Sequence, residues 1–124
     1  MNIHHFDHPE QAVPSYSQAV RGGDLIVTSG HLGAEPGGES VPFAVQAERA
    51  LTSLLETITT AGGSPGTILR INGYLADLDD FPAYNEVYRR IVVAPRPART
   101  TVQIARFFEP TLVEVDAIAL AVQR

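Results

Sequence analysis

Two segments near the end of the chain combine a strand-like pattern with charged side chains that can do chemistry. Residues 97–107 read PARTTVQIARF, and residues 112–122 read LVEVDAIALAV. Arg99 opens the first segment, and Glu114 lies inside the second. An arginine can hold a carboxylate through two parallel hydrogen bonds, and a glutamate can orient or deprotonate a water molecule. The pair is therefore a candidate for a site that binds a small carboxylate and activates water.

The alternation of side chains indicates which residues lie together. Successive residues of a strand point to opposite faces of a sheet, so Arg99, Thr101 and Gln103 share one face of their segment. Glu114 and Asp116 lie opposite the apolar valines of theirs. We expect the apolar faces to meet helices and the charged residues to share the other face of one sheet.

A sheet face of this mixed kind has two interpretations. Unpaired charges are costly to bury within one subunit, so the face is typical of an interface between subunits that encloses a polar cleft. Alternatively, Arg99 and Glu114 form a structural ion pair across the sheet. Spacing alone does not give the register between strands, so both interpretations stay open at this point.

The composition removes several kinds of chemistry. The 124 residues contain no cysteine and no lysine, and all nine basic residues are arginines. Disulfides, thiolate nucleophiles, zinc–thiolate sites and lysine Schiff bases are therefore excluded. Catalysis must use carboxylates, histidines, hydroxyls, arginines or backbone amides. The length suits one domain with its own core, spanning residues 1–124.

Charge and hydropathy limit the partners. The formal net charge is −5, so the chain as a whole is not attracted to nucleic acid. No apolar run approaches the ~20 residues that a membrane-spanning helix needs. The first residues, MNIHHFDHPEQ, lack the basic and then apolar pattern of a signal peptide, so we expect a cytoplasmic protein that binds neither nucleic acid nor membrane.

The pattern of apolar residues predicts the elements that must position these side chains. In chain order they are two short strands within 15–33, a long amphipathic helix over 42–61, a strand over 68–78, a second helix that starts after Asp80, and the two final strands. This β-β-α-β-α-β-β order predicts an α+β fold, in which both helices pack on one face of a mixed sheet.

Five segments, in this order and spacing, resemble the RidA / YjgF family of reactive-intermediate deaminases, formerly called L-PSP endoribonucleases. They are SYSQAV, LIVTSGHLG, the helix QAERALTSLLETITTAGGS, YLADLDDFPAYNEVY, and PARTTVQIARF followed by VEVDAIA. The resemblance implies a chorismate-mutase-like fold and a homotrimer with small-ligand clefts between subunits. It also implies hydrolysis of enamines and imines, such as 2-aminoacrylate and its imine tautomer, to 2-keto acids and ammonia, without a metal or cofactor.

The resemblance also implies roles for individual residues. Arg99 matches the arginine that binds the substrate carboxylate, and Glu114 matches the glutamate that positions the attacking water. The other matched pocket residues are Tyr16, Ser29, Gly30, Asn85 and Thr101. Thr101 stands where a cysteine is common in the family, and His31 stands where a glutamine usually follows the Ser-Gly pair. Two other functions remain as hypotheses: a non-catalytic regulator that binds small carboxylates in the same cleft, and a ribonuclease.

Several of these residues also have purely structural interpretations. Tyr16 is a partly buried tyrosine, Ser29 a strand-end hydroxyl bonded to backbone, Asn85 a helix-surface amide and Thr101 a β-former. His31 is either an acid–base group or a polar wall of the pocket. The cluster His4, His5 and His8 is either a metal site or part of a mobile terminus, and we expect the terminus.

Overall fold

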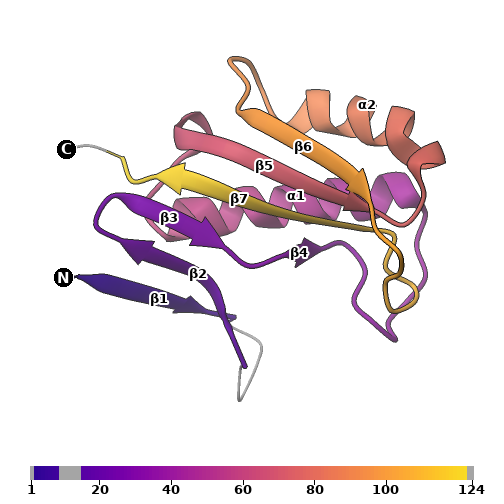
Figure 1. The fold of residues 1–124 in the computed structure, drawn as a ribbon, viewed down its shortest axis with the longest axis horizontal. Helices are drawn as coiled ribbons and strands as arrows, with labels where there is room; N and C mark the ends of the chain where they lie inside the picture. The colour runs from indigo at the N-terminus through magenta and orange to yellow at the C-terminus, as the bar shows by residue number, and fades with distance from the viewer. Residues whose placement is uncertain (1, 9–14, 123–124) are drawn as a thin grey trace.

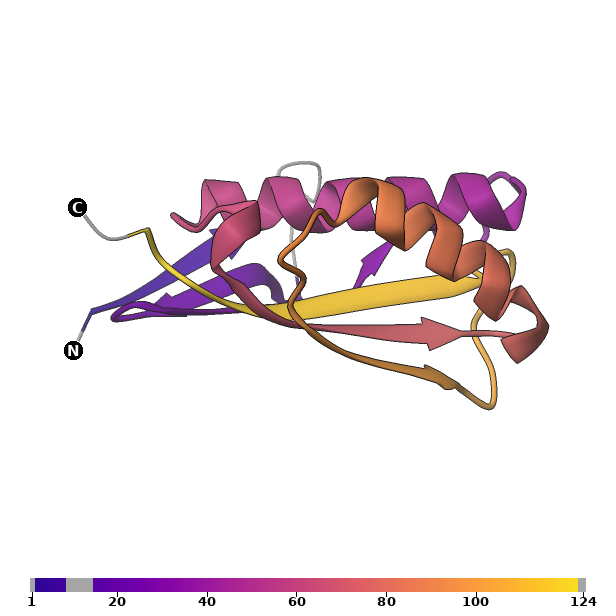
Figure 2. The same ribbon diagram turned by 90° about the horizontal axis from the view of Figure 1, so that it is seen from above.

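The protein consists of two layers, a twisted β-sheet and two α-helices that cover one of its faces. The computed structural model describes residues 2–8 and 15–122. Figure 1 shows the sheet with the helices behind it, and Figure 2 shows both helices on the same side of the sheet. The strands are β1 (Ile3–Asp7), β2 (Ser17–Gly22), β3 (Leu25–Thr28), β4 (His31–Leu32), β5 (Ile68–Leu75), β6 (Ala98–Gln103) and β7 (Val113–Leu120). This arrangement confirms the predicted α+β fold.

The strands lie in the order β1-β2-β3-β7-β5-β6, and β4 pairs with β7 beyond the end of β3. Only β5 and β6 pair in parallel; the other pairs among the described residues are antiparallel. Strands β1 and β4 were not predicted from the sequence. The expected mobile terminus is wrong for Ile3–Asp7, which pairs with β2 throughout, and His31–Leu32 is too short to show alternation.

Helix α1 (Phe43–Thr60) lies within one residue of its predicted bounds at each end. Pro42 precedes it without a side-chain cap. The chain leaves the helix at Gly62, whose φ of 104° is readily adopted only by glycine, and the next amide donates to the Ile58 carbonyl at 2.9 Å. The face toward the sheet is apolar at helical spacing, with Ala47, Ala50, Leu51, Leu54 and Ile58 buried.

Helix α2 (Phe81–Ile91) packs beside α1 and covers the strands at the other edge of the sheet, as Figure 2 shows. Its buried residues are Tyr84, Val87 and Tyr88. Arg96 closes its carboxyl end by donating to the carbonyls of Val92 at 2.8 Å and Arg89 at 3.0 Å. Within the described residues, no helix is both long and apolar enough to cross a membrane.

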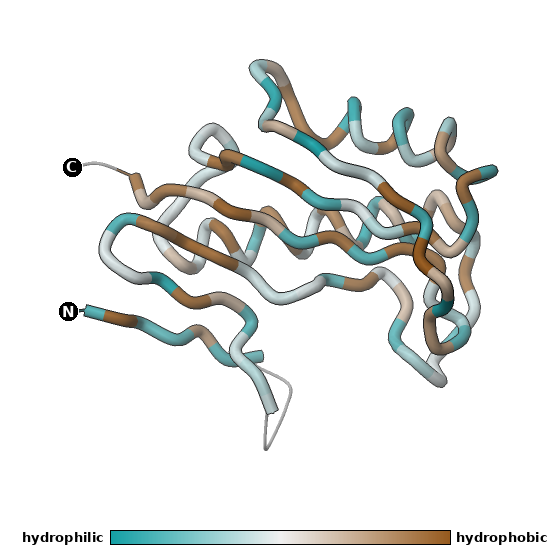
Figure 3. Tube along the Cα trace, viewed as in Figure 1, coloured by the Kyte–Doolittle hydropathy of each residue, from teal (hydrophilic) through white to brown (hydrophobic). Residues whose placement is uncertain are grey.

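Strand β7 runs through the middle of the sheet and shows the predicted alternation, visible as alternating colours in Figure 3. Val113 and Val115 are fully buried beneath the helices. Glu114 and Asp116 point to the opposite face. We call this uncovered side the open face; it carries Arg70, Asn72, Tyr74, Glu114 and Asp116 on β5 and β7.

The expectation that Arg99 shares a face with Glu114 is wrong. The parallel register pairs Arg99 with Ile71 and Thr101 with Gly73, two buried β5 residues that face the helices. Arg99 and Thr101 therefore lie on the helix-covered face. The apolar pattern misleads here because β6 is an edge strand, and its Val102 lies on the open face with 40% of its surface exposed.

A buried amide fixes the loop that follows β4 and the loop that leads into β7. Gln46, in the first turn of α1, donates to the carbonyls of Val41 at 3.1 Å and Pro110 at 3.0 Å, and its Oε1 accepts from the Leu112 amide at 2.8 Å. Gly33 passes so close to α1 that a Cβ there would overlap the Gln46 backbone. The start of β7, and with it Glu114, is therefore held against α1.

This close approach predicts a large difference between two glycine substitutions. We expect Gly33→Ala to lower the free energy of unfolding by roughly 1–3 kcal/mol or more, because backbone cannot move aside as a flexible side chain can. Gly22→Ala is the control, since a Cβ at Gly22 meets nothing within 4 Å. It should change stability by less than about 1 kcal/mol. Urea unfolding measures both, and equal stabilities would contradict the tight contact.

Candidate functional site

A bulge between β3 and β4 opens a cleft beside β7. Both strands pair with β7, where Val27 lies opposite Ile118 and His31 lies opposite Val115. His31 is four residues from Val27, whereas Val115 is only three residues from Ile118. The extra residue lies at Ser29–Gly30, where the chain leaves the regular ladder. This bulge turns the backbone of Gly30 toward the side chain of Glu114.

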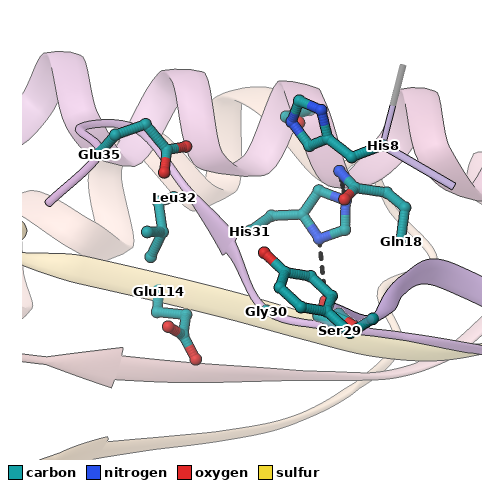
Figure 4. Close-up of a pocket in the computed structure, with 10 residues that line it drawn as sticks. His8, Gln18, Ser29, Gly30, His31, Leu32, Glu35 and Glu114 are labelled. Carbon is teal, nitrogen blue, oxygen red and sulfur yellow. Dashed lines mark hydrogen bonds between the residues drawn. The ribbon is translucent and has the colours of Figure 1, made fainter. Parts of the chain in front are cut away.

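The cleft has a volume of about 410 Å³ and brings Glu114 together with Tyr16, Ser29 and Gly30, three of the pocket residues implied by the resemblance. Its lining comprises His8, Tyr16, Gln18, Ser29, Gly30, His31, Leu32, Glu35, Ser53 and Glu114. A Cβ on Gly30 would lie 2.5 Å from Cδ and Oε2 of Glu114. The missing side chain of Gly30 therefore makes room for the carboxylate of Glu114, which Figure 4 shows pointing away from α1.

The Glu114 carboxylate has no hydrogen-bond or ion-pair partner within 2–8 and 15–122. Burial raises its pKa, and the negative charge of Asp116 raises it further. Asp116 itself is held in place, since it accepts from Asn72 Nδ2 at 2.8 Å and from the Tyr74 hydroxyl at 2.9 Å. Glu114 is thus a half-buried, unpaired carboxylate next to a fixed negative charge. This combination is typical of a general base.

A second cleft of about 550 Å³ adjoins Glu114 on the open face. Apolar and aromatic groups dominate its lining of Tyr74, Ile104, Arg106, Phe107, Phe108 and Glu114. Burial and the hydrogen bond to Asp116 raise the pKa of Tyr74 to about 12, so this wall of the cleft is uncharged. Glu114 therefore stands between a polar cleft and a more apolar one.

His31 has both ring nitrogens engaged, as Figure 4 shows in part. Its Nδ1 donates to the Ser29 carbonyl at 2.9 Å, so Nε2 is the acceptor, at 2.7 Å from Thr57 Oγ1 and 3.1 Å from Gln18 Nε2. The residue is 2% exposed, and burial lowers its pKa. A neutral ring with both nitrogens bonded favours the polar-wall interpretation over acid–base catalysis.

Two other cleft residues differ in how firmly they are held. The Ser29 hydroxyl donates to the Ser17 carbonyl at 2.6 Å, which is the strand-end bond considered as its structural role. That bond uses its proton and leaves its lone pairs as acceptors. Tyr16, which is 50% exposed, lies at the edge of the cleft.

Arg99, Asn85 and Thr101 lie elsewhere, on the helix-covered side of β6 and on α2. Arg99 is exposed and its guanidinium lies over aromatic rings of α2. Asn85 is half-buried on the same helix. Thr101 Oγ1 is buried and has no hydrogen-bond partner among the described residues.

The predicted site residues therefore form two groups on opposite faces of one sheet. Tyr16, Ser29, Gly30 and Glu114 form the cleft group, and the Arg99 group consists of Asn85, Arg99 and Thr101. An ion pair between Arg99 and Glu114 within one chain is excluded, because β5 separates their strands and the side chains point in opposite directions. The only salt bridge found in the described part of the chain joins Arg90 and Glu48, at 3.4 Å.

The amino-terminal histidines do not converge. His4 and His5 are neighbours on β1 and point to opposite sides of the strand, where His5 Nδ1 lies 3.2 Å from Ser17 Oγ. His8 lines the cleft near His31 instead. Within the described ranges, no three histidine, aspartate or glutamate side chains come close enough to hold a metal ion.

Sequence reasoning missed the groups that hold Asp116 in place. Asn72 and Tyr74 on β5 donate hydrogen bonds to Asp116. The Oδ1 atom of Asn72 accepts a hydrogen bond from Arg70 Nε at 3.1 Å. The alternation of β5 places all three on one face, but only the register with β7 shows which residue they meet.

Comparison with known proteins places the chain among relatives of similar length. A model of the family described as Endoribonuclease L-PSP matches residues 7–121. The 2-iminobutanoate/2-iminopropanoate deaminase of Capra hircus is 38% identical over 112 residues, covering 88% of this chain and 82% of the goat protein. Protein mmf2, mitochondrial, of Schizosaccharomyces pombe is 44% identical over 89 residues, covering 70% of each chain.

The fold has close matches among solved structures. The crystal structure of RidA from the Antarctic bacterium Psychrobacter superimposes with a TM-score of 0.79 and is 37% identical, covering 89% of this chain and 91% of that one. These matches agree with the resemblance found in the sequence. Because the fission-yeast relative is named as mitochondrial, the cytoplasmic location stays a prediction.

The position of Asp116 beside Glu114 predicts how Glu114 titrates. Replacing Asp116 with asparagine removes a negative charge while keeping the size of the side chain. We expect the pKa of Glu114 to fall, because its ionised form is no longer opposed by a neighbouring anion. Carboxyl carbon shifts in an NMR pH titration measure this change. Asp79→Asn, on the exposed turn before α2, is the control; an unchanged or higher pKa of Glu114 in Asp116→Asn would contradict the coupling.

Proposed function

The chain belongs to the Endoribonuclease L-PSP family, and we propose that it is a RidA-type deaminase that hydrolyses 2-imino acids to 2-keto acids and ammonia. Relatives in this family carry names that state this kind of activity. The single observation that carries the proposal is the unpaired carboxylate of Glu114, held in a cleft against Gly30 with a raised pKa. The substrates are 2-iminopropanoate and its enamine tautomer 2-aminoacrylate.

The reaction needs only positioning and one group that accepts a proton and returns it. A protonated imine carbon is already electrophilic, so neither a metal ion nor a covalent intermediate is required. Water adds to the C=N carbon as Glu114 accepts its proton, giving a carbinolamine. The protonated Glu114 returns this proton to the nitrogen, and the C–N bond breaks as the hydroxyl oxygen forms the carbonyl. The departing ammonia takes up the hydroxyl proton, so that R–C(=NH2+)–COO− and water become R–CO–COO− and ammonium. Holding the carboxylate and the water in line supplies most of the acceleration.

Arg99 is the proposed group that binds the substrate carboxylate. A small imino acid cannot reach Arg99 and Glu114 of the same chain, because they lie on opposite faces of its sheet. A site that uses both therefore takes Arg99 from one copy and Glu114 from another. In this arrangement Tyr16, Ser29 and Gly30 lie on the Glu114 side, while Asn85 and Thr101 lie on the Arg99 side.

A homotrimer with three such clefts is the proposed assembly. The open face supports self-association, because it exposes large apolar side chains between its polar groups. These are Leu25, Val27, Val102 and Leu120, each with 39–46% of its surface exposed. An exposed apolar patch of this kind is typical of a surface that another chain covers.

The cleft does not suit RNA cleavage, although the family description names an endoribonuclease. Its described lining contains two glutamates and no arginine, and the chain has no lysine. Phosphate backbones bind where Lys and Arg gather. His31, the histidine deepest in the cleft, has no nitrogen available for proton transfer.

Substitution of the two central residues tests the proposal. We expect Arg99→Ala to lower kcat/KM by roughly 30- to 5,000-fold, because losing a bidentate ion pair costs roughly 2–5 kcal/mol. Glu114→Gln should lower kcat by roughly 100- to 10,000-fold, since the base is lost. The assay measures ammonia and pyruvate released above the spontaneous rate, with 2-aminoacrylate generated in place by a serine dehydratase.

Arg90→Ala is the control for loss of an exposed arginine, because Arg90 makes only a surface ion pair with Glu48. Unaltered melting temperatures show that the variants fold. If wild type does not accelerate the reaction, deamination of this substrate is wrong. If Glu114→Gln keeps its turnover, Glu114 is not the base. A wild-type protein that binds pyruvate but shows no turnover would favour the non-catalytic regulator.

Mixing the two inactive variants tests the sharing of sites between copies. Each cleft of a mixed trimer receives an intact Arg99 with probability one half and an intact Glu114 with probability one half. Co-expression in equal amounts should therefore restore about one quarter of wild-type activity, as expected for a ring of identical heterologous interfaces. Activity that stays at the level of the separate variants would contradict a site built from two chains.

A further inference from the structure

Three aromatic rings of α2 surround the guanidinium of Arg99. The Arg99 Cζ lies 4.9 Å from the ring centroid of Tyr88, 5.4 Å from that of Phe81 and 5.8 Å from that of Tyr84. All three distances are within the ~6 Å range of a cation–π interaction. We call these three residues the aromatic cage. They recur at three- and four-residue spacing, so they form one stripe along the side of α2 that faces β6.

The cage holds the charge of Arg99 without neutralising it. No carboxylate of the described residues lies within ion-pair distance of Arg99, although acidic residues are common on the chain. Aromatic faces attract a cation through their π-electrons and accept none of its strong hydrogen bonds. Arg99 is an exposed residue, so the N–H groups of its guanidinium remain available for an incoming anion.

The cage is built into the core of the protein. Tyr84 is fully buried, and its ring packs 5.8 Å from that of Tyr88. Its hydroxyl lies over Gly73 on β5, where a Cβ would approach it to 2.7 Å. Gly73 thus makes room for the ring that forms the floor of the cage. Burial raises the pKa of both tyrosines, so both rings stay neutral and no phenolate pairs with Arg99.

From these contacts we infer that Phe81, Tyr84 and Tyr88 are positioning residues, which hold the Arg99 guanidinium unpaired and oriented for a small carboxylate. This inference rests on the proposed function, in which Arg99 binds the carboxylate of the imino acid. Without the cage, a flexible arginine on an edge strand samples many rotamers, and binding has to restrict them. The cage therefore acts on carboxylate affinity and leaves the proton transfer at Glu114 unchanged.

Leucine substitutions at Phe81 and Tyr88, the two rings nearest to the guanidinium, test the cage. We expect Phe81→Leu and Tyr88→Leu each to weaken pyruvate binding and to raise KM by roughly two- to tenfold, with kcat within about twofold of wild type. Tyr88→Phe keeps the ring and should behave like wild type. Pyruvate titrated by NMR or calorimetry gives the affinity without turnover.

Phe43→Leu is the matched control, because Phe43 is the first residue of α1 as Phe81 is of α2, and both are half-buried against the core. It should leave pyruvate binding unchanged. If Phe81→Leu and Tyr88→Leu bind like wild type while Arg99→Ala loses binding, the cage is wrong and the proposed function stands. If Phe43→Leu weakens binding as much, the effect is general and the cage is also wrong. If Arg99→Ala binds like wild type, the proposed role of Arg99 fails.

Discussion

The parallel pairing of β6 with β5 is the constraint on which the rest of the site depends. It aligns Arg99 with Ile71 and thereby directs the arginine to the helix-covered face. Glu114, on the antiparallel strand β7, points the other way. A shift of one residue in this register would turn Arg99 to the open face, on which Glu114 lies. The observed register keeps them apart within one chain and available to groups from outside it.

Each of the two charges is kept unpaired by a different physical device. Glu114 lies against the bare backbone of Gly30, so the carboxylate reaches the cleft without a cation beside it. Its neighbour Asp116, which Asn72 and Tyr74 hold in place, raises the pKa of Glu114, as its proposed role as a base requires. Arg99 is instead held by aromatic faces. Unpaired charges destabilise a folded chain, and their retention at two defined places is typical of a functional site.

The helices and the general fold could be predicted because their signals are local. The stop at Gly62 and the apolar spacing of α1 required no knowledge of other elements. The faces of β6 could not be predicted, because an exposed edge strand need not turn its apolar residues toward the helices, and Val102 does not. Strand β4 was missed because two residues show no period. Arg99 and Glu114 were identified as candidates from their residue types, and the other site residues through a family resemblance. Their division between two faces follows only from strand register.

The most direct test of a shared site is a crystal structure of the protein with bound pyruvate, the product of the proposed reaction. We predict that the pyruvate carboxylate lies at about 3 Å from the Arg99 guanidinium of one chain. We also predict that its carbonyl carbon faces the Glu114 carboxylate of a neighbouring chain in the same trimer. A structure in which pyruvate contacts Arg99 with Glu114 of every chain out of reach, or in which pyruvate binds away from Arg99, would contradict this site.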